Sequence, residues 1–297
     1  MFSLLWIPAT IAASVFQVAR NAVQRGLMAS SGPWGATLVR FLFGLPFSVL
    51  FATVAYCWAP ALTPHFSRAF WLSAGVGALS QVLATASLLV AMQRAGFAVG
   101  TALQQSSLPL AALLGLFVYG DQLGMAAWIG VGITTAGLAV LTWPGRRSTG
   151  SRPVSGAFFG LMSGLCFGFS LNGFRHATLT LEPAHPVFSA LASVAIAQAM
   201  QAGTLLAILL VFDRAAVRAV VAGWRESIVA GLCGALASSG WFLALALAPA
   251  ASVRALGVIE SPIAAVAGHR LFSERLRAGQ ILAGGAVMIG VLLTTLY

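Results

Sequence analysis

The chain has 297 residues, of which 59% are hydrophobic and only 7% are charged, and its mean hydropathy is +0.94. A soluble domain carries about 25% charged residues, so this composition excludes a soluble fold and indicates a helical protein with many membrane spans. The net charge of +10 does not indicate a nucleic-acid partner, because the arginines fall mostly at the ends of apolar segments, where they set orientation and meet anionic lipid headgroups.

Ten apolar segments long enough to span a bilayer follow one another along the chain. A helix needs ~20 residues to cross the hydrocarbon core, and several segments are longer, so tilt or overhang is expected. Residues 212–225 are expected to form a further, short helix at the membrane interface. The ten expected spanning helices are 3–25, 32–59, 69–93, 97–118, 124–143, 154–176, 185–212, 226–248, 250–271 and 278–296.

A polar stretch rich in glycine, proline and arginine, residues 144–153, divides the ten helices into two sets of five. We expect a first five-helix repeat over 1–143, this linker, and a second five-helix repeat over 154–297. Residues 95–138 and 248–291 support the division because they superimpose without a gap. The matching pairs include Ala95/Ala248, Leu103/Leu256, Pro109/Pro262, Gly115/Gly268, Leu123/Leu276, Gly132/Gly285 and Gly137/Gly290, with Asp121 opposite Glu274.

The number of helices in each repeat fixes the relation between the repeats. Because five is odd, the second copy enters the membrane from the opposite side, and the two repeats are inverted. Most arginines lie in the loops after the first, third, fifth, seventh and ninth expected helices. The positive-inside rule places these loops in the cytoplasm and both termini outside.

Polar groups inside the membrane are costly, and they usually face protein or water, so they mark a candidate site. The clearest set lies in the first expected helix, at spacings of four and three residues that place it on one face. Arg20 lies beside this stripe. Helix–helix hydrogen bonding is one interpretation, and a cavity wall is the other, favoured by the length of the stripe. The stripe consists of Thr10, Ser14, Gln17, Asn21 and Gln24.

Further polar positions occur in the third, fourth and eighth expected helices. Gln104 and Ser107 stand just before Pro109, where a proline removes a backbone donor and frees a carbonyl group. Neighbouring side chains either satisfy such backbone groups or present them to a ligand. Gln81 in the third helix, with Ser238 and Trp241 in the eighth, completes this set.

Glu260 is the only acid deep within an expected spanning segment, near the middle of the ninth. A carboxylate at that depth either pairs with an arginine or takes up and releases a proton during transport. Arg254 lies on the same helix but its direction differs, which leaves Arg40 in the second helix as the other candidate partner. The alternative for Arg40 is an extended side chain that reaches the membrane surface.

The sequence shows no cluster of histidine, cysteine and acid at metal-ligand spacing, no phosphate-binding loop and no paired carboxylates. We therefore expect neither an enzyme nor a bound cofactor or metal. With no nucleotide site in this chain, any driving force must come from gradients or from a partner.

The duplicated segment resembles the EamA repeat of the drug/metabolite transporter superfamily. The resemblance consists of a mid-helix proline, an acid near a tight turn in Phe272-Ser273-Glu274-Arg275-Leu276, and a glycine-rich closing helix. Arg40-Phe41 is similar to the Arg-Phe pair of the second helix of that repeat. The second half departs from the pattern with Ala192-Ser193-Val194, and Asp121 replaces the usual glutamate.

The resemblance implies an all-α integral membrane protein of ten transmembrane helices, arranged as two inverted five-helix repeats around a central cavity. It also implies export of small solutes across the bacterial inner (plasma) membrane. The branch that the chain resembles is that of the YddG-type exporters of aromatic and neutral amino acids. The expected partners are a small-molecule substrate and membrane lipid, without nucleic acid, and the expected assembly is a monomer.

We therefore expect an exporter of small amphipathic metabolites, neutral or aromatic amino acids first, that works by alternating access. Amide and hydroxyl groups would bind the polar atoms of the substrate, and Trp241 its apolar part. Arg40 or Arg20 would meet a carboxylate, and Glu260 an ammonium group or a proton. The expected substrate-binding residues are Gln17, Asn21, Arg40, Gln81, Gln104, Ser107, Ser238, Trp241 and Glu260.

Two alternatives remain open at this point. One is a transporter of another kind, namely an importer, a drug exporter or a sugar-phosphate carrier, although a sugar phosphate would require several convergent basic groups. The other is a membrane scaffold or lipid-handling protein without a small solute. The long polar stripe of the first helix argues against a purely structural bundle.

Overall fold

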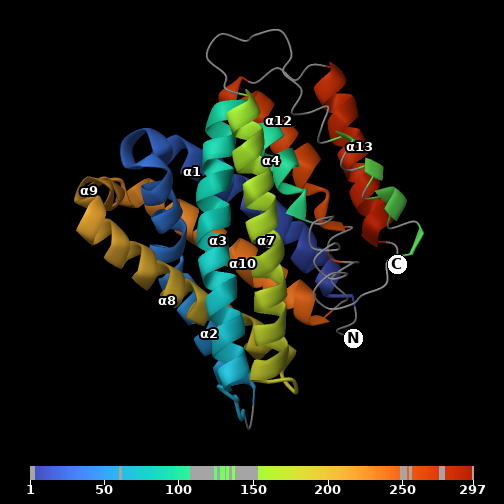
Figure 1. Ribbon diagram of the computed structural model, residues 1–297. Helices are drawn as coiled ribbons and strands as arrows, with labels where there is room; N and C mark the ends of the chain where they lie inside the picture. Colours follow the sequence, from blue (N-terminus) through green and yellow to red (C-terminus); the bar gives the residue numbers. More distant parts are fainter. Residues whose placement is uncertain are drawn as a thin grey trace. The chain divides into compact units, whose positions relative to one another are not determined.

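The computed structural model describes residues 4–59, 62–107, 153–247, 256–273 and 278–295, with residue 253 and several isolated positions between 124 and 137. All regular structure in these residues is helical, as the composition predicts (Figure 1). Most of the expected helix 124–143, the linker up to residue 152, Pro109, Arg254 and the paired acids Asp121 and Glu274 lie outside the described residues. These expectations stay predictions.

Five stretches of the described chain are long and apolar enough to cross a membrane. They are Trp6–Trp58, Arg68–Ala95, Val154–Leu181, Pro186–Phe212 and Trp224–Leu247. The first contains two helices, α1 (Trp6–Leu42) and α2 (Leu45–Trp58). The others correspond to α3 (Arg68–Ala95), α7 (Pro153–Leu181), α8 (Pro186–Phe212) and α10 (Trp224–Leu247).

Helix α1 runs from Trp6 to Leu42 with a break at Gly32. The sequence predicted instead two separate helices here, 3–25 and 32–59. Gly32 has φ 65° and ψ 178°, a conformation that is essentially restricted to glycine. Pro33 follows at the first position of the next helical segment, where its missing N–H is not required. Gln24 Nε2 donates to Ala36 O at 2.6 Å, so the two segments of α1 contact each other across the break.

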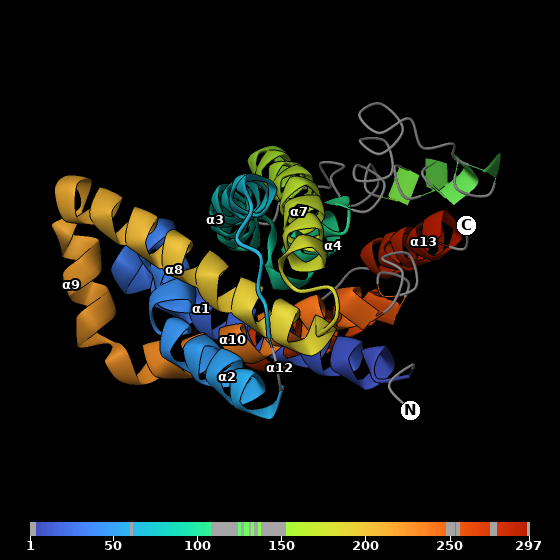
Figure 2. The same ribbon diagram turned by 90° about the horizontal axis from the view of Figure 1, so that it is seen from below.

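The helices form two compact units, each built from residues on both sides of the expected linker. Unit 1 comprises Met1–Val82 and Phe169–Ala248, and unit 2 comprises Leu83–Gly168 and Pro249–Tyr297. The division falls within α3 and within α7, which run side by side (Figures 1 and 2). Within unit 2, Ser163 Oγ of α7 donates to Ala84 O of α3 at 2.8 Å.

In unit 1, α1 and α10 approach each other very closely. Glycines of α10 make this possible: a Cβ at Gly231 would lie 2.4 Å from the carbonyl carbon of Phe43, and one at Gly240 would lie 2.9 Å from Ala9 O. The short helix α9 (Arg214–Ala222) joins α8 to α10 (Figure 2) and begins where Asp213 Oδ1 accepts the Ala216 N–H at 3.0 Å. The expectation of a short helix within 212–225 is therefore confirmed.

Unit 2 contains α4 (Phe97–Gln104), α12 (Glu260–Phe272) and α13 (Ala278–Thr295). Leu103 and Val99 of α4 form a core with Val258 and Val287. The rings of Phe97 and Phe272 add to it, with centroids 5.3 Å apart. The described part of the expected helix 250–271 is not continuous, because turns at 258–259 precede α12.

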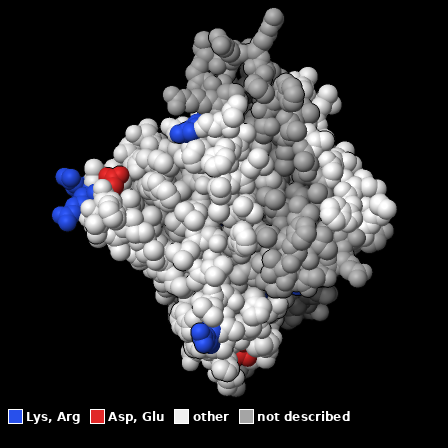
Figure 3. Space-filling model, viewed as in Figure 1, with Lys and Arg blue, Asp and Glu red and all other residues white. Residues whose placement is uncertain are grey.

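The outward faces of the long helices are apolar. On α3, Leu72, Val76, Leu79 and Leu83 follow one helical face and are all at least half exposed. Few charged side chains appear on the face shown in Figure 3; blue atoms gather where α9 lies, and Arg214 and Arg218 of that helix are exposed. Because an exposed apolar face of this extent is unfavourable in water, these helices indicate a multi-pass membrane protein.

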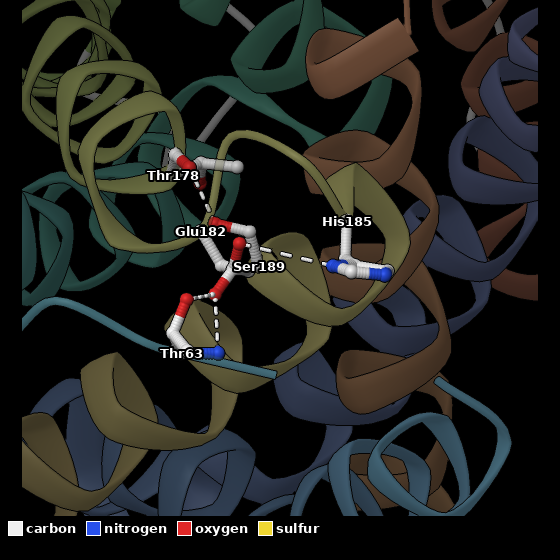
Figure 4. Close-up of polar contacts among 5 residues, drawn as sticks. All are labelled: Thr63, Thr178, Glu182, His185 and Ser189. Carbon is white, nitrogen blue, oxygen red and sulfur yellow. Dashed lines mark hydrogen bonds and ion pairs between the residues drawn. The ribbon is translucent and has the colours of Figure 1, made fainter. Parts of the chain in front are cut away.

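Glu182, the residue after α7, accepts a hydrogen bond from the segment that precedes α3 (Figure 4). Its Oε2 accepts the backbone N–H of Thr63 at 2.9 Å, and its Oε1 lies 3.7 Å from His185 Nδ1. The His65 N–H adds a bond to Leu181 O at 2.8 Å. This acid therefore holds the turn between α7 and α8 against the connection from α2 to α3.

Replacing Glu182 with alanine is expected to lower the free energy of unfolding by about 2 kcal/mol, because the Thr63 N–H loses its acceptor. Glu182→Gln is the matched control, since its amide oxygen still accepts from Thr63, and its loss should be clearly smaller. Thermal unfolding in detergent, followed by intrinsic fluorescence, measures both. Equal losses for the two variants would show that the bond to Thr63 is not what stabilises this connection.

Candidate functional site

The polar stripe of α1 is buried along its whole length: its five side chains are at most 8% exposed. Its members differ in what they contact. Thr10 Oγ1 donates to Trp6 O at 2.7 Å and Ser14 Oγ to Thr10 O at 2.9 Å, so both hydroxyl groups bond within their own helix. Gln24 donates a hydrogen bond to Ala36 O across the break of α1. Gln17 and Asn21 are the two that join a cluster with other parts of unit 1.

Gln17 contacts Trp241 of α10. The indole Nε1 donates to Gln17 Oε1 at 2.8 Å. Both residues were expected at the site from the sequence, and the structure brings them together although 224 positions separate them. The bond orients the indole ring against the polar face of α1.

Asn21 is bound by the arginine next to it. Its Oδ1 accepts from Arg20 Nε at 3.2 Å and from Arg20 Nη2 at 2.7 Å. Arg20 is completely buried. The sequence interpretation offered Arg20 as an alternative to Arg40 for binding a substrate carboxylate, and the structure makes it part of the cluster. The only signal in the sequence was an arginine next to a polar stripe.

Arg40, from the second segment of α1, reaches the same place. It is 3% exposed, which argues against a side chain extended to the membrane surface. Its Nη2 lies 3.4 Å from Ser238 Oγ of α10, as a donor to that hydroxyl. A Cβ at Gly234 would lie 3.1 Å from Arg40 Cγ and 3.3 Å from Arg20 Cδ, so both arginine stems pack against this one glycine.

Gln81 of α3 is paired with a residue that the sequence interpretation did not include. Gln201 Nε2 of α8 donates to Gln81 Oε1 at 2.8 Å and to Ala78 O at 3.3 Å. Ser48 Oγ of α2 likewise donates to Gln198 Oε1 at 2.8 Å. The spacing of Gln198 and Gln201 in an otherwise apolar helix is a signal that these amides share a face.

Three of the expected residues belong to unit 2. Gln104 and Ser107 are buried at the end of α4, and the backbone at Ser107 lies close to Gly164 of α7, where a Cβ would be 2.9 Å from Ser107 N. Glu260 is 3% exposed and is the first residue of α12. The expectation that it stands in mid-helix is therefore wrong; its carboxylate lies at a helix N-terminus, where the helix dipole favours an acid.

The residues expected at the site fall into two groups in the described structure. Unit 1 holds the α1–α10 cluster, which we define as Gln17, Arg20, Asn21, Arg40, Ser238 and Trp241. Gln81 lies in the same unit, paired with Gln201. Unit 2 holds Gln104, Ser107 and Glu260. The α1–α10 cluster supplies two guanidinium groups, hydroxyl and amide groups and one aromatic ring, a set suited to a small anion with an apolar part.

Comparison with known proteins shows likeness at the level of fold. A solved structure described as "Crystal structure of protein" has a TM-score of 0.63 and 16% sequence identity, over 99% of this chain and 98% of that chain. It is one of 18 solved chains that match. No family model matches the chain, and no curated protein matches it.

Proposed function

We propose that this chain is a secondary transporter of the drug/metabolite transporter superfamily, with ten membrane helices in two inverted repeats. It exports small amphipathic metabolites, neutral or aromatic amino acids first, from the cytoplasm. One observation carries the proposal: a cluster of polar and cationic side chains is buried within helices whose outward faces are apolar. Such groups are costly inside a membrane, so their concentration in one place supports a binding site for a polar solute.

In this proposal the α1–α10 cluster binds the substrate, with Trp241 against its apolar part. From the sequence, Gln104, Ser107 and Glu260 are proposed as further polar contacts and as the source of a proton or counter-charge. The two repeats rock against each other to expose the site to either side of the membrane. A solute gradient or an ion gradient supplies the drive.

Uptake of labelled phenylalanine into proteoliposomes tests the proposal. The double variant Asn21→Ala/Gln104→Ala is expected to lose at least about tenfold in initial rate, since each substitution removes a buried polar group that is proposed to bind the substrate. The matched control is Ser30→Ala/Thr53→Ala, which removes two exposed hydroxyl groups and should leave the rate unchanged. Unchanged uptake by the Asn21/Gln104 variant would rule this site out.

The scaffold alternative has one observation in its favour: Gln81–Gln201 and Ser48–Gln198 are side-chain bonds between helices, of the kind that hold membrane bundles together. A thermal-shift screen against amino acids, drugs and phosphorylated sugars separates the candidates, because only a bound ligand stabilises the fold. A scaffold gives no shift in any class. Each transporter alternative gives a shift confined to its own class.

A further inference from the structure

We propose that the outward face of α9 binds an anionic phospholipid, and that the bound headgroup strengthens the packing of α9 against α1 and α10. The outward face is defined as Arg214, Arg218 and Val221, three exposed residues that follow one side of the helix. This inference goes beyond the proposed function and does not depend on it, because lipid binding is measured without any transported solute.

Helix α9 lies where a surface helix of a membrane protein is expected. It joins α8 to α10 (Figure 2), and both of these helices are long and apolar enough to cross a membrane. A helix of 9 residues between two spanning helices is too short to cross the bilayer itself, so it lies near the bilayer surface. Trp224, half exposed at the start of α10, is of the residue type that favours this boundary. The distribution of arginines predicts the cytoplasmic side, where the leaflet carries anionic lipids.

Arg214 and Arg218 present two guanidinium groups on the outward face, where Figure 3 shows basic side chains. Arg214 Nε donates to Leu210 O at 2.7 Å, and Arg218 Nε donates to Arg214 O at 3.4 Å, so one nitrogen holds each side chain against the helix backbone. Neither arginine forms an ion pair with an acid in the described part of the chain. Like charges four residues apart on a helix repel each other, and an anion that contacts both guanidinium groups offsets this repulsion.

The acids of the same segment do not cancel the charge of the outward face. Residues 213–226 contain three arginines and two acids. Asp213 Oδ1 accepts the Ala216 N–H at 3.0 Å as the cap of α9, and Glu226 lies in the first turn of α10. Both carboxylates therefore lie at the start of a helix, where the helix dipole stabilises them. The outward face itself carries two positive charges and no negative charge.

Apolar surface next to the two guanidinium groups favours a lipid over a free anion. Val221 is more than half exposed on the same face as the arginines, and Val211 and Phe212, just before them in the chain, are exposed still further. A phosphodiester between the guanidinium groups would place its glycerol and acyl chains over these side chains. A zwitterionic headgroup fits less well, because the arginines repel its own cation.

The inward face of α9 connects the lipid to the packing of α1 and α10. A Cβ at Gly35, in the second segment of α1, would lie 3.4 Å from Ala216 Cβ. Val220 forms a core with Val39 of α1 and Ala230 of α10. A ligand that binds α9 only in this packed arrangement stabilises the three helices together against unfolding, by mass action.

Thermal unfolding in nanodiscs tests the proposal on the unaltered protein first. Nanodiscs of phosphatidylcholine alone are compared with nanodiscs that also contain phosphatidylglycerol. We expect phosphatidylglycerol to raise the unfolding temperature by at least about 3 °C, and the shift to shrink as salt is added. Native mass spectrometry of protein released from the mixed nanodiscs should show phosphatidylglycerol retained in preference to phosphatidylcholine.

The double variant Arg214→Gln/Arg218→Gln assigns the effect to α9. It removes two charges from exposed positions and keeps good helix formers, so the protein should fold, lose the shift and retain much less phosphatidylglycerol. Arg68→Gln, which alters an exposed arginine at the start of α3, is the matched control and should preserve both results.

Three results would overturn the proposal. One is a shift of equal size in the double variant, because the lipid would then act elsewhere on the chain. Another is the absence of any shift for the unaltered protein. The third is an equal shift when inorganic phosphate is added to phosphatidylcholine nanodiscs, which would show that the face binds a free anion. Phenylalanine uptake is not part of this readout, so the proposed function stands or fails separately.

Discussion

Replacing Gly231 with alanine is expected to lower the free energy of unfolding by about 3 kcal/mol. The added Cβ would lie 2.4 Å from the carbonyl carbon of Phe43, 2.6 Å from its oxygen and 2.7 Å from Gly44 N. All three are backbone atoms between α1 and α2, so no flexible side chain can move aside. The helices must separate, and the separation extends along α10 to the contacts of Gly234 with the two arginines.

Gly203→Ala on α8 is the matched control for Gly231→Ala. No atom lies within 4 Å of a Cβ at Gly203, and alanine is the better helix former, so stability should rise by about 0.5–1 kcal/mol. Thermal unfolding in detergent compares the pair, and uptake of labelled phenylalanine reports on the α1–α10 cluster. An unfolding temperature for Gly231→Ala equal to that of the unaltered protein would contradict the close approach of α10 to α1.

The periodicity of α1 predicted which side chains share a face but not what each one contacts. Thr10, Ser14 and Gln17 belong to one stripe and are all buried, as predicted. Two of them bond to the backbone of their own helix, and Gln17 bonds to Trp241. Spacing along a helix determines only the direction in which a side chain points. Its hydrogen-bond partner depends on which other helix packs there, and for Gln17 that helix is far away in the sequence.

Helix breaks were predicted less well than helices. The sequence suggested a connection near 26–31, but α1 continues to Gly32, since no residue before that glycine requires a non-helical backbone. Because the break is later and sharper than expected, Arg20 and Arg40 meet at Gly234, which the spacing of polar residues could not indicate. The break before Glu260 was missed as well: this residue was expected in mid-helix, but it is the first residue of α12.

Apolar composition predicted the long helices well because a segment that crosses the bilayer has to be both apolar and helical. The expected segments 69–93, 185–212 and 226–248 correspond to α3, α8 and α10 with ends shifted by only a few residues. A spanning helix must bond all its backbone groups internally, and this requirement is readable from a continuous apolar stretch. The two glutamines of α8 were missed because the polarity of two residues does not alter that stretch, although it creates pairs with Gln81 and Ser48.

Gly32→Ala is expected to lower the free energy of unfolding by about 2 kcal/mol and to slow the uptake of labelled phenylalanine. No atom lies within 4 Å of a Cβ at this position, so the cost comes from the backbone alone: φ 65° with ψ 178° is a conformation that alanine scarcely adopts. Relief of this strain changes the direction of the second segment of α1, which carries Arg40 away from Arg20 and Gly234.

Gly26→Ala, earlier in the same helix, separates backbone strain from a general effect of adding a methyl group. Its Cβ also has no neighbour within 4 Å, and Gly26 has no positive φ, so the change should stabilise α1 by about 0.5–1 kcal/mol. Thermal unfolding in detergent and phenylalanine uptake in proteoliposomes are measured on both variants. If Gly32→Ala takes up phenylalanine as fast as Gly26→Ala, the break in α1 is not what positions Arg20 and Arg40 for transport.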